Sequence, residues 1–504
     1  MDAARGAFYR IHDIGEKTGH IDAILRRLDF HPLSVNLLAT VARQNRWDNN
    51  RLVEEWEEHQ TGVLQTEHSK SLAVTIELSL ASPMFQQLGP DARGLLGVIA
   101  FFPQGVDEKN LEWLFPTISN RKTTFDKFCI LSLTHRNNGF ITMLAPLRDY
   151  LCPKDPMTAT LLSATKDLYT ARLSAVVNHT GPASEDERWI TSEDANIEHL
   201  LDVFSSADPN SDNIWGSCED FICHLQTHKP RQTVLGPKFE RLPDDHRRKP
   251  SGLFETAALL NLLGKVEDGK RLLLYALKLW RDRRDSDDWV ARTLRCLAET
   301  NHKLGLIEEG TQQAKEGLEV FERLGDAVGQ AECLVRLASL LLQTNQFDAA
   351  EEATIRSINL LGEGQEFRLC DSHRVLGDIY SAKMEGGKAI HHHEIALRIA
   401  GAFNWYDQLF WTHDTLARLL GEKGEFDKAH IHINQAKEHA VDNGYWLAHA
   451  KEVHGWIWYL QGRHEDAVAE ALGAIEMYGK LGLAKEQEDC KYFLQHIEQS
   501  TNKL

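Results

Sequence analysis

The sequence predicts a mainly all-α protein, in which a compact helical front part precedes an α-solenoid built from helical hairpins. Two observations carry this prediction. A pattern of small residues recurs six times in the second half of the chain, at steps of 41, 40, 39, 40 and 38 residues. In the first half, apolar residues at helical spacing form segments that are separated by proline and glycine.

The recurring pattern has three positions in each unit, and all eighteen hold Ala, Gly or Ser. Because residues without bulk let two helices approach closely, each unit is predicted to be a hairpin whose helices cross at these points. The middle series is Gly269, Gly310, Ala350, Ala389, Ala429 and Ala467; twelve residues earlier stand Ala257, Ala298, Ala338, Gly377, Ala417 and Gly455, and seven residues later Ala276, Gly317, Ser357, Ala396, Ala436 and Ala474.

Composition narrows the class of protein. A length of 504 residues suits one compact part plus a solenoid. The 74 acidic against 56 Lys and Arg residues give a net charge of -18, which repels phosphate backbones and argues against nucleic acid as a partner. The eight cysteines form no CxxC pair, so neither a disulfide framework nor a zinc site is indicated. With no long apolar run and no signal-peptide layout at the N-terminus, we expect a soluble, cytoplasmic protein that does not enter a membrane.

Residues 1–65 are predicted to form a helical segment. Apolar residues at helical spacing indicate two short helices within Gly6–Leu28. Pro32 suits the first turn of a helix, and the apolar run after it indicates a buried helix. A further helix is expected over Asn50–Glu58.

Residues 66–152 are predicted to be a winged-helix-like module, because several helices precede a small hairpin. Asn137-Asn138-Gly139 is a hairpin-type turn, Phe140–Leu144 is strand-like, and Pro146 opens a final helix. The helices are expected at Ser71–Leu80, Asp91–Phe102 and Val106–Phe115, with another ending in Phe128–Leu133.

Residues 153–250 are predicted to be a helical connector made of degenerate hairpins, and residues 251–500 an array of six repeats. The connector begins with a long helix over Met157–Val177. Its later helices are expected at Ala195–Phe204, Trp215–Thr227 and Val234–Leu242.

Particular strings add a resemblance to a family. Leu28–Val35, which reads LDFHPLSV, resembles the proline-leucine helix entry of NB-ARC proteins, the signalling nucleotide switches of the STAND class. Met143–Leu151 resembles the segment that carries their Met-His-Asp motif. Leu52–Trp56 and Ile76–Ser82 are similar to forms found in fungal NB-ARC proteins that end in tetratricopeptide repeats. The resemblance continues through the repeats and implies the C-terminal part of an NLR-like receptor.

Two departures limit what this resemblance implies. The phosphate-binding GxxxxGK[ST] loop and its acidic strand are missing, so we expect no enzymatic activity from this chain and a start at Met1 that follows the nucleotide-binding core. Leu144 and Ala145 replace the family's histidine and acid. Pro32 matches the adenine-packing proline, although a first-turn proline explains it more simply. No cofactor is therefore expected here, and ADP or ATP would bind only together with the missing core.

The repeats themselves resemble tetratricopeptides. Leu376-Gly377, Tyr380, Ala389 and Ala396 reproduce that consensus at its own spacings. By this resemblance the first helix of each pair lines a concave groove that holds a protein or peptide. Counting from the small residues places ten side chains there: Arg295, Glu299, Arg336, Arg374, Asp378, Trp411, Asp414, Arg418, Glu452 and Trp456. Their arginines and tryptophans suit acidic or aromatic groups of a ligand, and the alternative is an ordinary solvated face.

Several histidines suggest metal binding without supporting it. Consecutive helical residues point about 100° apart, so His391, His392 and His393 cannot converge on one ion. His430, His432 and His439 lack metal-ligand spacing and are expected at the surface. We therefore predict no metal site, and the absence of a GxSxG nucleophile motif leaves no sign of catalysis.

Three functions remain open at this stage. The favoured one is the ligand-sensing arm of a fungal STAND receptor in non-self recognition and programmed cell death, with self-association on activation implied by the family. A free-standing tetratricopeptide adaptor is the second. The third is a winged-helix transcription regulator, for which the candidate recognition helix Arg121–Leu133 offers only Arg121, Lys122 and Lys127 against Asp126.

Overall fold

The computed structural model describes residues 2–13, 20–28, 30, 32–60, 67–115, 118, 120–154, 159–177, 185–228, 230–283, 286–440 and 443–501. Asp29, His31 and Met157, which belong to the strings and helices predicted above, lie outside these ranges. The chain forms two compact units: Met1–Ala171 with Glu193–Leu200, and Arg172–Ser192 with Leu201–Leu504. Both are mainly α-helical, as predicted. Among the helices described, none is both long and apolar enough to cross a lipid bilayer.

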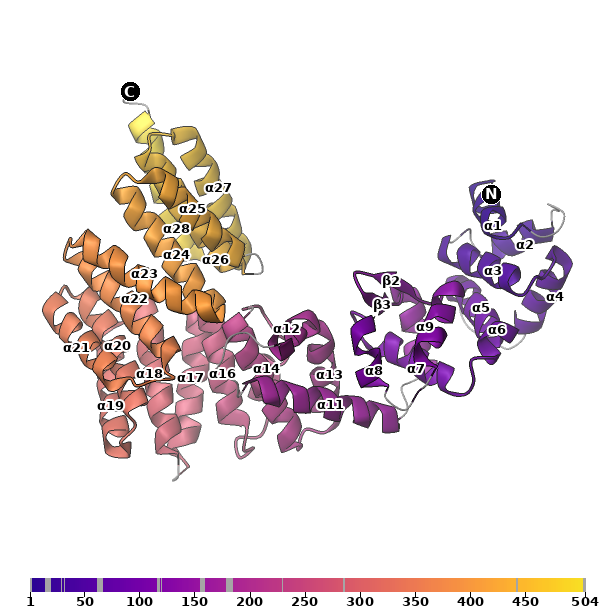
Figure 1. Cartoon of the computed structure of the whole chain (residues 1–504), viewed down its shortest axis with the longest axis horizontal. Coiled ribbons are helices and arrows are strands. Elements are labelled where there is room, and N and C mark those ends of the chain that lie inside the picture. Colours follow the sequence, from indigo (N-terminus) through magenta and orange to yellow (C-terminus); the bar gives the residue numbers. More distant parts are fainter. Residues whose placement is uncertain are drawn as a thin grey trace. The chain divides into compact units, whose positions relative to one another are not determined.

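The first unit begins with a helical cluster around a core of Phe8, Leu25, Leu38 and Trp56. Leu38 lies in the helix that begins at Pro32, and the sequence predicts this helix to be buried. The helices of this part, drawn in indigo in Figure 1, are α1 (Asp2–Ile11), α2 (His20–Arg27), α3 (Pro32–Gln44), α4 (Asn49–Gln60), α5 (Glu67–Ala81) and α6 (Pro83–Gln86).

A small antiparallel sheet follows, with the strand order β1-β3-β2. Asn138 and Gly139 both have positive φ, as the predicted hairpin turn requires. The elements are α7 (Asp91–Phe101), β1 (Val106–Asp107), the 3-10 helix η1 (Glu108–Asn110), α8 (Leu111–Leu114), α9 (Arg121–Ile130), β2 (His135–Asn137), β3 (Phe140–Thr142) and α10 (Ala145–Lys154). The prediction of one helix over Val106–Phe115 is wrong, because Val106 and Asp107 pair with Ile141 and Phe140.

The segment between the small sheet and the repeats is helical, and the division between the two units falls within its first helix. Its elements are α11 (Ala159–Val177), α12 (Glu185–Ser192), α13 (Asp194–Ala207), α14 (Asp212–His228) and α15 (Gly236–Arg241). In the first unit, Glu193 is fully buried and accepts hydrogen bonds from Asn110 at 2.9 Å and Asn196 at 2.6 Å.

Among the described residues, six helical hairpins and a final helix make up the repeats, and Figure 1 shows the paired helices from α16 onward. All eighteen small residues of the sequence pattern are buried at the helix contacts, as predicted. The helices are α16 (Lys249–Leu262), α17 (Val266–Arg281), α18 (Asp287–Lys303), α19 (Ile307–Leu324), α20 (Ala327–Gln343), α21 (Phe347–Leu360), α22 (Glu366–Ala382), α23 (Gly386–Phe403), α24 (Tyr406–Glu422), α25 (Phe426–His439), α26 (Gly444–Leu460), α27 (His464–Leu481) and α28 (Ala484–Thr501).

The turn inside each hairpin contains one residue with left-handed backbone conformation. These residues are Gly264, Gly305, Asn345, Met384, Gly424 and Gly462, with φ between 59° and 83°. Glycine and asparagine adopt this conformation readily at a helix C-terminus, whereas methionine does not.

The array also contacts itself across its length. The side-chain amide of Asn443, just before α26, donates to the carbonyl of Leu262 at the end of α16, over 3.4 Å. The ring of Tyr445 lies against Gly264, so close that a Cβ added to this glycine would stand 2.8 Å from it. Leu262 also packs on the core of Phe410 and Trp446. The first hairpin therefore touches the fifth and sixth.

Candidate functional site

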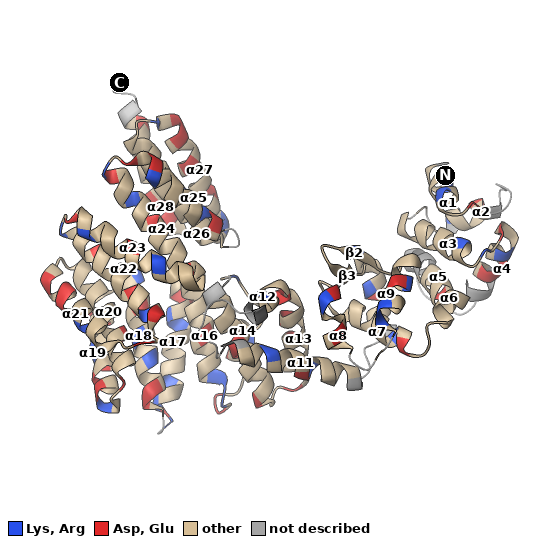
Figure 2. Cartoon of the chain, viewed as in Figure 1, with Lys and Arg blue, Asp and Glu red and all other residues tan. Residues whose placement is uncertain are grey.

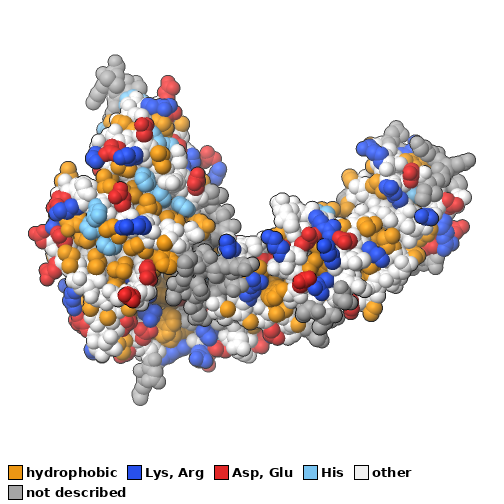
Figure 3. All heavy atoms as spheres, in the orientation of Figure 1, with side chains coloured by type: hydrophobic (Ala, Val, Ile, Leu, Met, Phe, Trp, Pro, Cys, Tyr) orange, Lys and Arg blue, Asp and Glu red, His pale blue; other side chains and the backbone are white. Residues whose placement is uncertain are grey.

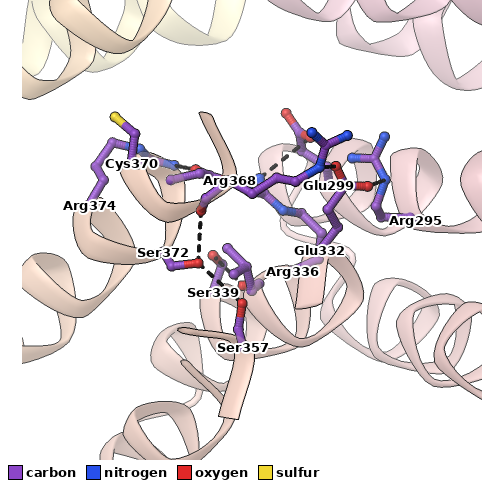
Figure 4. Close-up of polar contacts among 12 residues, drawn as sticks. Arg295, Glu299, Glu332, Arg336, Ser339, Ser357, Arg368, Cys370, Ser372 and Arg374 are labelled. Carbon is purple, nitrogen blue, oxygen red and sulfur yellow. Dashed lines mark hydrogen bonds and ion pairs between the residues drawn. The ribbon is translucent and has the colours of Figure 1, made fainter. Parts of the chain in front are cut away.

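The inner face of the repeats encloses a pocket of about 460 Å³. Its walls come mostly from the first helices of five successive hairpins, α16, α18, α20, α22 and α24, with additions from α14 and α21. This agrees with the expectation that first helices line the concave face. Figure 4 shows side chains of α18, α20 and α22 reaching toward one another across the gaps between these helices.

Charged residues dominate the pocket, and most are paired across neighbouring helices. Glu332 of α20 contacts Arg295 of α18 at 3.2 Å and Arg368 of α22 at 2.8 Å. Two arginines therefore share one carboxylate. Since opposite charges on three consecutive first helices bond to one another, this cluster fixes the spacing of the helices as well as the polarity of the wall.

A second series of ion pairs lies on the same helices, about one turn closer to their C-terminal ends. Glu299 contacts Lys303 at 3.3 Å and Arg336 at 3.5 Å. Arg336 also pairs with Asp371. Arg374 then continues the series, since it contacts Asp371 at 2.9 Å and Asp378 at 3.4 Å. Figure 2 shows basic and acidic residues interspersed along the repeat helices rather than separated into one face of each sign.

Burial and neighbouring charge shift the ionisation of these groups. Burial alone would raise the pKa of Glu299, but the charges of Lys303 and Arg336 outweigh it and hold that pKa well below its usual range. Burial, together with the charge of Arg336, lowers the pKa of His302 to about 4. The pocket is therefore strongly ionic at neutral pH, with a neutral histidine beside the charges.

Six of the ten side chains predicted for the groove line this pocket: Arg295, Glu299, Arg336, Arg374, Asp378 and Trp411. The other four are placed as follows. Asp414 is buried and lies 3.3 Å from His449. Glu452 accepts a hydrogen bond from Tyr478 at 3.0 Å, Trp456 stacks on Tyr459, and Arg418 is exposed. Pro32 is the exposed first residue of α3, in the other unit.

Besides Lys303, sequence reasoning missed four charged residues that line the pocket: Glu332, Arg368, Asp371 and Asp407. They stand 6, 9, 6 and 10 residues before the small residues of their own first helices, Ala338, Gly377, Gly377 and Ala417. Apart from Arg336 and Trp411, the predicted groove residues stand 3 residues before or 1 residue after the small residue of their first helix. Continuing the helical period backward by one and two turns would have found them, because residues 3 or 4 apart share a face.

Histidine pairs join the two helices of the fourth and fifth hairpins. The Nδ1 atoms of His373 and His392 lie 3.1 Å apart, and those of His413 and His432 lie 2.9 Å apart. Figure 3 shows histidines gathered over this part of the array. His430, His432 and His439, expected at the surface, are partly exposed, but each is half-buried and contacts another histidine. A facing helix provides the partner, which spacing along one helix does not reveal.

The candidate recognition helix of the small-sheet module, α9, is surrounded by acids. Arg121 pairs with Glu112 at 3.2 Å. Arg136 of β2, beside this helix, pairs with Glu108 and with Asp126 of α9 itself. These carboxylates reduce the positive field that a nucleic-acid backbone requires.

Comparison with solved structures places the fold among tetratricopeptide-repeat solenoids. A STAND protein with a tetratricopeptide repeat sensor from Pyrococcus horikoshii matches with a TM-score of 0.50 and 14% identity, covering 100% of this chain and 74% of that one. A Rap protein complexed with competence and sporulation factor matches with a TM-score of 0.44 and 10% identity, covering 67% and 99%. No family model and no curated protein matches the sequence.

Proposed function

We propose that the repeats bind a peptide or an exposed protein segment in the concave pocket, and that the chain is the sensing part of a STAND-type signalling protein. The observation that carries the proposal is the pocket itself, whose wall comes from five consecutive first helices and whose ion pairs lie on three of them, α18, α20 and α22. Ion pairs removed from water often contribute less stability than apolar side chains of the same volume would, so a repeat array that needed only to pack would fill this space with apolar side chains.

The sensing role rests on how a ligand would act. A ligand that contacts α16 through α24 at once would favour one spacing of these helices over others. Binding would thereby shift a conformational equilibrium by its preference for one state, which is how a switch is driven. The fold likeness to a STAND protein over the whole chain supports a nucleotide-binding core as the receiver of that shift.

A pocket-blocking variant tests the binding role. Ser339 of α20 lines the pocket and forms no ion pair in the wall, so Ser339→Phe should fill the space while leaving the charged series intact. The probe is a library of short random peptides displayed on phage, selected against the purified chain. We expect enrichment by the wild type and its loss, by about tenfold or more, with Ser339→Phe.

Gln312→Phe is the matched control, since Gln312 is exposed on α19 and does not line the pocket. Both variants should keep the helical circular dichroism of the wild type. If Ser339→Phe enriches the same peptides as the wild type, the pocket is not the binding site and the proposal is wrong.

The free-standing adaptor is the second candidate function, and it shares the same pocket. It differs in requiring no partner that binds nucleotide. The winged-helix regulator is disfavoured by the acids around α9, and we expect the chain not to bind duplex DNA at low salt.

A further inference from the structure

One carboxylate in the pocket differs from all the others. Glu299, Glu332, Asp371 and Asp378 each contact at least one basic side chain. Asp407, which lines the same pocket, forms no ion pair with any residue that the structure describes. Its Oδ1 is shielded from solvent and has no hydrogen-bond partner there.

An unpaired carboxylate in such a place weakens the folded chain. Burial raises the pKa of Asp407 to about 6, even though backbone N–H groups at the start of α24 and the charge of Arg374 favour the ionised form. The group therefore gains a proton more readily than an ordinary aspartate. A cation supplied from outside would remove this cost, because it would pair with the carboxylate.

The surroundings of Asp407 suit a cation with an apolar stem. Trp411 lies one helical turn further along α24, so its indole and the carboxylate share one face of the helix. Both line the pocket, as does the partly exposed ring of Phe367 on α22. An indole face attracts a cation and a carboxylate pairs with one, so the two together suit an ammonium or guanidinium group.

The balance of charges in the pocket wall also favours a ligand with a positively charged group. In the cluster on α18, α20 and α22, Arg295 and Arg368 share Glu332, which leaves one positive charge in excess. The series from Lys303 to Asp378 contains three basic and three acidic groups. Asp407 is the unmatched negative charge. A ligand that carries both signs, as a peptide does, would match both.

We propose that the pocket recognises a positively charged group of its peptide ligand, which pairs with Asp407 and lies against Trp411. The group is an amino terminus or the side chain of a lysine or arginine. This inference rests on the proposed function, since it assigns a ligand chemistry to the same pocket.

The test uses three peptide libraries against the full chain. The first has free amino termini and no lysine or arginine. The second has acetylated termini and includes both basic residues, and the third has acetylated termini and no basic residue. The wild type is expected to retain peptides from the first or the second library, according to the source of the cation, and about tenfold fewer from the third.

Asp407→Asn is the decisive variant, because it keeps the shape of the side chain and removes its charge. It should lose the preference for cationic peptides by about tenfold. Asp427→Asn is the matched control: Asp427 is likewise the second residue of its helix, α25, but is exposed and outside the pocket. It should bind as the wild type does.

The outcomes separate this inference from the proposed function. Equal retention of all three libraries, unchanged by Asp407→Asn but abolished by Ser339→Phe, would overturn the cation site and leave peptide binding in place. Retention of no library by the wild type would overturn both.

Thermal denaturation of the free chain gives a second readout that needs no ligand. Since the pKa of Asp407 is about 6 in the folded chain and about 4 in the unfolded one, its burial costs no stability below about pH 4; the cost grows between these two values and is complete above about pH 6. Asp407→Asn should therefore raise Tm most at about pH 7.5 and by about half as much at about pH 5. An equal effect at both values would contradict an unpaired charge.

Discussion

At the scale of single residues, the histidine pairs show how one position can change its chemistry from repeat to repeat. His413 and His432 stand 4 before and 3 after the small residues Ala417 and Ala429 of their hairpin, and His373 and His392 occupy the same places one repeat earlier. In the third hairpin these places hold Leu334 and Ala353, both in the apolar core, and in the sixth Lys451 and Glu470, which form an ion pair at 3.2 Å.

Acid should weaken the fold through these pairs. In each pair one Nδ1 donates its proton to the other, an arrangement that is lost when both rings are charged. Burial and the nearby His432 and His439 lower the pKa of His413 to about 4. The unfolded chain takes up this proton near pH 6.5, so stability is complete above that value and is lost as pH falls toward 4, by on the order of 3 kcal/mol.

The double variant His413→Leu with His432→Ala copies the third hairpin and should reduce the fall in Tm between about pH 7 and about pH 5. His391→Gln, which changes an exposed histidine, serves as the control and should show the full fall. The interpretation fails if the double variant loses as much stability on acidification as the wild type.

At the scale of the element, one of the six hairpin turns has a strained backbone, the turn that contains Met384. Met384 has φ of 62°, a left-handed conformation that glycine or asparagine adopts at the five equivalent turns. Its side chain is 91% exposed, so replacing it removes little packing. Met384→Gly should therefore stabilise the array by about 1 kcal/mol, because the strain of a side chain in this conformation disappears.

Urea denaturation followed by circular dichroism measures this gain. Met384→Ala is the control, since alanine has the same backbone strain as methionine and should leave the midpoint nearly unchanged. A similar gain from both substitutions would mean that the exposed side chain, rather than the backbone, is unfavourable.

Most helices and turns could be predicted from the sequence, because they depend on residues that are close together along the chain. The small residues at fixed spacing predicted both helices of each hairpin, and Asn138-Gly139 predicted the turn between β2 and β3. β1 was missed because a strand of two residues exists only through its pairing with β3. Less of the pocket could be predicted, because its ion pairs join residues on different helices. The sequence indicates that Arg336 faces inward, but not that Asp371 lies beside it.

At the scale of the second unit, the contact between the first and last hairpins is the feature that no local pattern reveals. Gly264 and Gly305 are equivalent turn residues with φ of 77° and 72°. Only Gly264 has a neighbour, the ring of Tyr445, while an added Cβ at Gly305 meets nothing within 4 Å. The two glycines therefore have the same left-handed backbone conformation and differ in this one contact.

The comparison of Gly264→Ala with Gly305→Ala isolates the contact. Both should lose about 1 kcal/mol from the left-handed backbone. Gly264→Ala should lose a further 1–3 kcal/mol, on the order expected for overpacking, because the Tyr445 ring has to move. Chemical denaturation provides the measurement. Equal losses would show that the contact between the hairpins contributes little to stability.

That contact between Asn443 and Leu262 also bears on how the array folds. In an open solenoid each repeat touches only its neighbours, so the ends fray independently and unfolding spreads from either one. A bond from the sixth hairpin back to the first joins the two ends, and α16 is then held by α26 as well as by α17. Loss of either terminal hairpin removes support from the other, so we expect amide protons of the first and sixth hairpins to exchange in a single cooperative opening rather than in two separate ones.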